Sequence, residues 1–325
     1  TACGGGFIVA FLCFIKTGVG NIDGTSPLFK AFFYSINYAV GFCTIYLMHL
    51  TLATKQPSMT AARLAQSLVP TSGSDLNIKD FTTLFAQLVR SQMIAFLGNV
   101  VAGFAVSLGI FYLLDVVFNI EVLKYSKAYH YWEEVITLDW HIFYFGAIAG
   151  VFLFLSGLIS GMTINSQRFN NIPERIYHHP ILKKTFSIER RRKISNWFEK
   201  NWGGVVGNVA FGFMMGCAFL IGDFTGQPFD IRHITFVAGN FAIGIGGMGY
   251  HFEIGPMIIG FIAVFMVGWS NFLVSFTFSL LVAMRSNNIP FYKIFTMISH
   301  TMKAFFRNPL PFFIPPLWTK RKEEA

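Results

Sequence analysis

The amino-acid sequence predicts an all-α protein, a polytopic bundle of transmembrane helices. Hydrophobic residues make up 54% of the 325 residues and charged residues only 13%, which is about half of the one-quarter that soluble domains carry. The charges are also clustered and leave long uncharged stretches between them. A helix needs ~20 residues to cross the hydrocarbon core of a bilayer. Six uncharged stretches reach that length: residues 31–54, 91–114, 140–167, 201–222, 233–252 and 254–284.

A seventh apolar segment, residues 4–15, stands close to the first residue of the chain. Because this run begins almost at once and no initiator Met precedes it, we interpret it as the remaining part of a membrane helix. The visible chain is then expected to be the membrane half of a longer protein. Residues 1–285 are predicted to form one transmembrane domain with six to seven membrane segments.

The distribution of Lys and Arg predicts which loops face the cytoplasm. Residues 165–203 carry nine Lys or Arg against three Glu, and positively charged loops stay on the cytoplasmic side. Residues 115–139 carry five acidic residues against two Lys, with aromatic residues around Trp132 that are typical of a membrane interface. We expect loop 165–203 in the cytoplasm, where it would meet anionic lipid headgroups.

The C-terminal residues 286–325 are also basic, which conflicts with seven simple crossings. Three crossings after loop 165–203 would place this tail outside. The weakest crossing is residues 231–252, which contain five glycines and are followed by Glu253 and Pro256. We expect this segment to be a re-entrant or broken helix, because non-helical backbone at membrane depth is tolerated where protein or water lines it. The alternative is seven crossings and an outside tail.

Two stretches have the amphipathic spacing of helices that lie in the membrane interface. Apolar side chains recur at helical spacing opposite Arg90 in residues 78–93, and opposite Lys293 in residues 290–306. Prolines that follow the second stretch end its helix. Residues 286–325 are therefore predicted to form an interfacial amphipathic helix and a proline-rich, basic, cytoplasmic tail.

Short motifs recur along the chain and predict an inverted repeat. The pattern Thr-x-Gln-Pro occurs at residues 54–57 and 225–228, which would lie on opposite faces of the membrane, and a Gly-Asn pair occurs in three apolar segments. In secondary transporters, inverted repeats place a binding site near the membrane midplane. The candidate ligand-binding amides are Gln56, Asn99, Asn208, Gln227 and Asn240. The alternative is that each Asn hydrogen-bonds a neighbouring helix and holds the bundle together.

Residues 223–233 form the densest polar stretch between two apolar runs. Ionisable groups near membrane depth are costly unless they are paired, so Asp230 with Arg232, or Asp223 with Arg232, is a candidate functional site. His233 follows directly and is a candidate proton-binding side chain. The alternative is a short, solvated outer loop with a surface ion pair.

The sequence predicts no cofactor and no metal site. The four cysteines lie in or beside apolar runs without a C-x-x-C pair, and neither G-x-S-x-G nor H-E-x-x-H occurs. An enzyme is therefore not expected. Loops of the positive-inside type account for the net charge of +9, so nucleic acid is not an expected partner.

Three separated motifs resemble a family of bacterial membrane proteins that carries the label site-specific recombinase. They are residues 52–61 (LATKQPSMTA), residues 88–92 (LVRSQ) with Gly98-Asn99, and residues 229–236 (FDIRHITF). The resemblance extends from about residue 4 to residue 285. It implies a multi-pass protein of the bacterial inner membrane, with a non-membrane portion upstream.

For function, we expect transport, or the handling of a lipid or solute, through a polar site between the helix repeats. The first alternative is a non-catalytic membrane subunit or scaffold, with membrane lipids and other membrane subunits as its partners. The family label implies recombination as a further alternative, although the His-x-x-Arg motif of tyrosine recombinases does not occur in the sequence.

Overall fold

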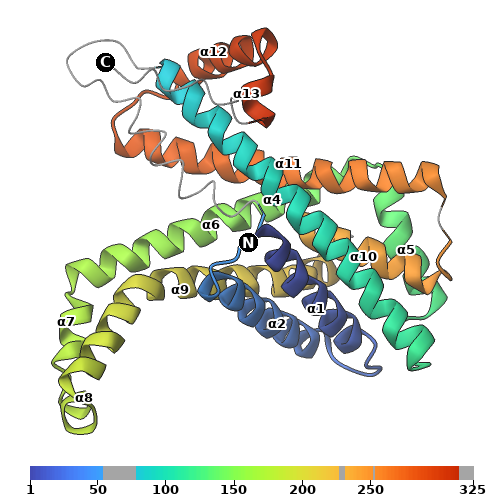
Figure 1. The fold of residues 1–325 in the computed structure, drawn as a ribbon, viewed down its shortest axis with the longest axis horizontal. Coiled ribbons are helices and arrows are strands. Elements are labelled where there is room, and N and C mark those ends of the chain that lie inside the picture. Colours follow the sequence, from blue (N-terminus) through green and yellow to red (C-terminus); the bar gives the residue numbers. More distant parts are fainter. Residues whose placement is uncertain (54–77, 227–230, 252, 315–325) are drawn as a thin grey trace, which may run out of the picture.

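The computed structural model is helical throughout the residues that it describes, which are 1–53, 78–226, 231–251 and 253–314. Within these ranges there are helices and connecting turns and no β-strand. Figure 1 shows the long helices running in two main directions, with α6, α9 and α11 along one and α1, α2 and α4 along the other. The predicted all-α class is confirmed.

Six helices of the described chain are long and apolar enough to cross a membrane, which confirms the predicted number of full-length segments. They are α1 (Ala2–Gly20), α2 (Pro27–Leu47), α4 (Ile78–Tyr112), α6 (His141–Phe169), α9 (Ile188–Thr225) and α11 (Ile254–Ser286). The apolar run of α4 continues through a π-helical turn, η1 (Leu113–Val117). The chain is therefore built as a membrane-spanning bundle.

Shorter helices connect or flank these six. They are α5 (Tyr125–Ile136), α7 (Ile172–Tyr177), α8 (Pro180–Thr185), α10 (Ile234–Gly247), α12 (Lys293–Arg307) and α13 (Leu310–Phe313). The basic stretch 165–203 is helical: it holds the end of α6, the short helices α7 and α8, and the first turns of α9. Figure 1 shows α7 and α8 at the far end of the α6–α9 pair, away from α10.

The glycine-rich segment 231–252 contains the short helix α10, which is too short to cross. Its 14 residues span about 21 Å at 1.5 Å per residue, against ~30 Å of hydrocarbon. α10 contacts α1, α4, α5 and α11, and nearly all of its residues are buried. These findings agree with the prediction of a broken or re-entrant segment.

One of the two predicted interfacial helices is wrong. Residues 78–93 are the first part of α4, which continues unbroken into its membrane-spanning part. Their apolar positions face protein: Phe81 and Leu88 are buried, and the ring of Phe85 lies 5.3 Å from that of Phe276 on α11. The amphipathic pattern there arose from helix–helix packing. α12, by contrast, is a separate amphipathic helix, as predicted.

α2 and α9 approach each other closely because glycines line their contact. A Cβ atom on Gly212 would lie 2.4 Å from the backbone nitrogen of Ala39, and a Cβ atom on Gly216 would lie 2.3 Å from the backbone nitrogen of Ser35. A larger side chain fits there only if a backbone moves. Such small residues let helices associate in a bilayer, where no hydrophobic drive brings them together.

Replacing Gly212 with Ala should weaken this contact. We expect G212A to lower the free energy of unfolding by about 1–3 kcal/mol, the usual cost of overpacking a core, and to lower the midpoint of thermal unfolding in detergent. G109A is the matched control, because a Cβ atom on Gly109 meets no atom within 4 Å. Equal midpoints for the two variants would contradict the α2–α9 contact.

Candidate functional site

The start of α10 lies inside the protein, where its backbone N–H groups cannot be hydrated. The first turn of any helix leaves such donors without helical partners. Here the Asn271 side-chain oxygen accepts from the Ile234 N–H at 3.1 Å, and His233 Nδ1 accepts from the Thr235 N–H at 3.4 Å. Side chains therefore cap the buried helix start.

Asn271 joins three elements at this point. Its Nδ2 donates to the carbonyl oxygens of Gly146 on α6, at 2.8 Å, and of Arg232, at 2.9 Å. With the bond from Ile234, the fully buried amide holds α6, α10 and α11 together. A cost of about 1–3 kcal/mol for each buried polar group left unpaired makes this residue important for stability.

Asn99 of α4 also joins several segments at the start of α10. Its Oδ1 accepts from the Thr235 hydroxyl at 3.3 Å and from the Ala53 N–H at 3.4 Å, and its Nδ2 donates to the Thr51 carbonyl at 2.9 Å. The same Nδ2 also lies 3.2 Å from the Ala2 carbonyl oxygen. We call Asn99, His233, Thr235 and Asn271 the α10 clamp.

His233 completes the α10 clamp as a neutral ring. Its Nε2 lies 3.2 Å from the Ala53 carbonyl oxygen, which can only accept, so Nε2 carries the proton. Its Nδ1 accepts from Thr235, which requires an unprotonated nitrogen. The side chain is fully buried. It therefore lies inside the bundle, not in a solvated loop.

A small polar cavity lies beside the α10 clamp. Its volume is about 20 Å³, enough for about one water molecule. Residues of α1, α2, α5, α9 and α10 line it together with the segment just before α10. The polar side chains among them are Lys16, Tyr38, Glu134, Arg232, His233 and Asn240. We call this space the polar cavity.

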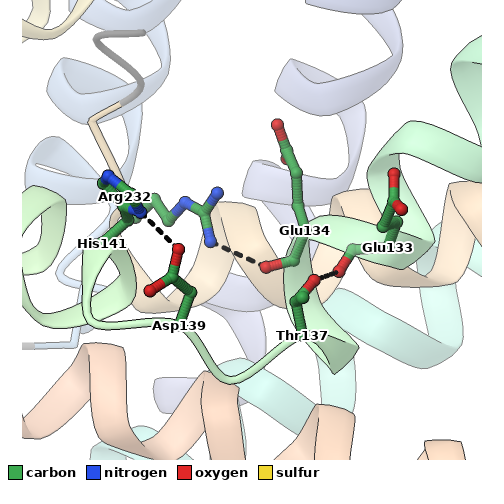
Figure 2. A network of polar contacts seen from close by, with 6 residues as sticks. All are labelled: Glu133, Glu134, Thr137, Asp139, His141 and Arg232. Atoms are coloured by element: carbon green, nitrogen blue, oxygen red, sulfur yellow. Dashed lines mark hydrogen bonds and ion pairs between the residues drawn. The ribbon is translucent and has the colours of Figure 1, made fainter.

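Arg232 links the polar cavity to the end of α5. Figure 2 shows its guanidinium reaching the backbone carbonyl of Glu134, with Nη1 donating at 2.8 Å. The last carbonyls of a helix lack helical partners, and a cation near them also interacts favourably with the helix dipole. The Thr137 hydroxyl donates to the Glu133 carbonyl in the same turn. Arg232 therefore acts as a cap for α5.

The carboxylate of Glu134 points away from this bond in Figure 2. Its Oε1 lies 2.8 Å from Nε2 of His130, one turn earlier on α5. Burial raises the pKa of Glu134, but the hydrogen bond from His130 and the positive charges of Arg232 and Lys16 outweigh burial and hold this pKa below its usual value. Glu134 is therefore an anion at neutral pH, facing two cations.

Asn240 supplies the polar cavity with an open acceptor. Its Oδ1 is buried and accepts no hydrogen bond within the part of the chain that the structure describes. Buried amide oxygens are nearly always paired. A water molecule or a solute in the polar cavity would satisfy this one.

The far end of α10 is also attached. The Tyr250 hydroxyl donates to Asp115 of η1 at 3.0 Å, and Tyr250 has a left-handed backbone with φ of 62°, which is unusual for a bulky residue. Burial and the hydrogen bond to Asp115 raise the pKa of Tyr250 to about 12. α10 is thus held at both ends.

The predicted site residues fall into three groups. Arg232, His233 and Asn240 line the polar cavity. Asn99 does not line it, but binds Thr235 in the α10 clamp beside it. Asn208 is buried in α9 and donates to the Gly204 carbonyl of its own helix at 2.8 Å. Gln56, Gln227 and Asp230 lie outside the described residues. Over the described ranges, no three His, Cys, Asp or Glu residues are grouped to hold a metal ion.

Five polar residues of the site were not predicted: Lys16, Tyr38, Glu134, Thr235 and Asn271. Lys16 is the only charged residue in α1, and a lone charge in an apolar helix is itself a signal of function. Asn271 stands in the middle of the longest uncharged stretch, without a neighbouring Gly to mark it. Glu134 is one of the five acidic residues of the stretch 115–139, and only its contact with the α10 region shows its role.

Removing the Asn271 amide should destabilise the protein strongly. N271A removes the partner of the Ile234 N–H and of the Arg232 carbonyl and the added bond to Gly146, so we expect a loss of roughly 3 kcal/mol or more in the free energy of unfolding. N287A is the matched control at the end of the same helix, where the Asn287 amide donates to the Ala283 carbonyl and the Ser286 hydroxyl of its own last turn. Thermal unfolding in detergent measures both, and a similar small loss for the two variants would contradict the role of Asn271.

The Glu134 carboxylate should make stability depend on pH. The pKa of Glu134 in the folded protein lies below the ordinary glutamate value of 4.5. Its contribution to stability is therefore complete above that value and is lost as pH falls through the folded pKa. We expect a shallower loss of stability on acidification for E134Q than for the parent protein. E133Q, on an exposed neighbour, should behave as the parent does. If the free energy of unfolding fell equally with pH for all three proteins, the pairing of Glu134 with its neighbouring cations would be contradicted.

Comparison with known proteins places the chain in a family. No curated protein and no solved structure matches it. A family model described as site-specific recombinase matches residues 1–315, nearly the whole chain, which confirms the resemblance of the three sequence motifs. The chain belongs to the family described as site-specific recombinase.

Proposed function

We propose that this chain forms the membrane part of a protein that transports or otherwise handles a small polar solute, with the polar cavity as its binding site. The observation that carries the proposal is the group of Lys16, Glu134, Arg232 and Asn240 around one cavity in an apolar bundle. Ionisable side chains at membrane depth are costly, and they usually mark solute or ion pathways.

The short helix α10 supports the proposal. Secondary transporters bind solutes beside helices that break within the membrane, and α10 starts inside the bundle beside the polar cavity. At about 20 Å³, the cavity holds about one water molecule, so this is a closed form. A solute would enter when α10 and α5 move apart.

The alternatives receive less support. A scaffold needs no polar cavity, and its buried charges would be a cost without a benefit. The family description names a DNA reaction. Six apolar helices around buried polar groups fit the passage of a solute. The exposed basic side chains of residues 165–203 fit the positively charged loops of membrane proteins without a phosphate backbone as partner.

We further propose that the chain lies in the bacterial inner membrane with residues 165–203 in the cytoplasm. The basic side chains of this stretch lie on α7, α8 and the first turns of α9, and positively charged segments near membrane ends face the cytoplasm. There they would meet anionic lipid headgroups. Figure 1 shows this hairpin at one end of the molecule, as this orientation requires.

Access to the polar cavity tests the solute-handling proposal. In a variant with its four native cysteines replaced by Ala, Asn240 is changed to Cys, and a membrane-impermeant thiol reagent is added to either side of sealed proteoliposomes. We expect N240C to react from both sides if the cavity opens alternately, and from one side if the protein only receives or delivers the solute.

The matched control for this experiment lies on α10 itself. Ala238 lies on the same helix, fully buried in the apolar core, and A238C should stay unreactive. If N240C were as unreactive as A238C from both sides, the polar cavity would be a sealed structural feature and the scaffold alternative would replace solute handling.

A further inference from the structure

α12 presents three different faces around its axis. One face packs on the protein, where Met297 and Thr301 are buried and the Thr301 hydroxyl lies 3.4 Å from that of Thr82 on α4. The other two faces are exposed, one apolar and one polar. A helix of 15 residues is about 22 Å long, so α12 does not cross a bilayer.

The exposed apolar face is a continuous stripe. Its side chains recur every three or four residues, which places them on one side of the helix. They are Phe295, Ile298, Met302 and Phe306, with exposed fractions of 75%, 52%, 45% and 76%. Leu310 and Phe313 of α13 add 62% and 42% exposed side chains. A stripe of this kind marks an interaction surface.

The polar face is basic and carries no acidic residue. Residues 287–314 contain Lys293, Lys303 and Arg307 and neither Asp nor Glu. At about 100° per residue, these three side chains lie together on one side of the apolar stripe. The long stems of Lys and Arg can cover apolar surface while their charges reach a polar boundary. The surface therefore combines an apolar stripe with a purely positive edge.

The surface is fixed in place by contacts to the bundle. Arg90 of α4 donates from Nη1 to the Pro311 carbonyl at 2.9 Å, and the ring of Phe305 on α12 lies 5.2 Å from that of Phe312. Figure 1 shows α12 and α13 together beside the first turns of α4. The stripe and its basic edge are thus already formed before any partner binds.

We propose that this α12–α13 surface binds anionic phospholipids of the membrane that the six long helices cross. The apolar stripe would enter the acyl boundary, and each basic residue would meet a lipid phosphate, as amphipathic helices do at an interface. A second copy of the chain is a poorer occupant, because it would bring the same basic edge against this one. The proposal does not depend on the polar cavity.

A lipid titration tests the proposal. In the cysteine-free variant, a polarity-sensitive fluorophore is attached at F295C on the stripe or at T296C on the polar face, and phosphatidylglycerol or phosphatidylcholine is added to the full-length protein in detergent. We expect phosphatidylglycerol to shift the F295C signal towards an apolar environment at far lower concentration than phosphatidylcholine does, with no shift for T296C.

Charge-removal variants complete the test. Each basic residue near an anionic surface is worth roughly fivefold in affinity. The triple variant K293Q/K303Q/R307Q should therefore need on the order of a hundredfold more phosphatidylglycerol. K124Q, at an exposed position just before α5, removes a positive charge outside both basic surfaces and should titrate as the parent does. Equal responses to both lipids, no F295C shift with either, or disulfide-linked F295C dimers would each overturn the proposal.

Discussion

The structure depends on one constraint, which is that a helix start buried in a membrane protein must have every polar backbone group paired. α10 begins within the bundle, and water cannot serve its first N–H groups. Asn271 and His233 accept from these groups, and Asn99 binds the Thr235 side chain. α4, α6 and α11 are therefore joined where α10 begins.

The polar cavity lies beside the buried start of α10. Because the chain before α10 must turn inside the bundle, it brings Arg232 against the end of α5, where the guanidinium pairs with a carbonyl that the helix leaves free. The carboxylate of Glu134 then balances part of the positive charge of Arg232 and Lys16. The same irregularity that costs backbone hydrogen bonds also creates the place where ionisable groups can lie at depth.

The sequence predicted the helices well and the site only in part. Five of the six long uncharged stretches and the shorter run 4–15 correspond to the six spans, because length and hydropathy decide crossing. The sixth stretch, 233–252, holds only α10, and its glycine content had marked it as irregular. Arg232 and His233 were predicted from local polarity, and Asn240 from the recurring Gly-Asn pair. Asn271 and Lys16 were missed because their roles come from partners distant in sequence. Residues 78–93 were wrongly predicted to lie in the membrane interface, because packing on α11 and contact with lipid produce the same periodicity of apolar side chains.

The order of the chain adds a consequence for biogenesis. Ala2, Thr51 and Asn99, which prepare one side of the α10 start, are synthesised before it, whereas Asn271 is synthesised after it. α10 is also too short to be inserted as an independent span. The start of α10 is therefore fully hydrogen-bonded only after α11 has been inserted. The bundle is completed by a late assembly step and not by sequential insertion alone.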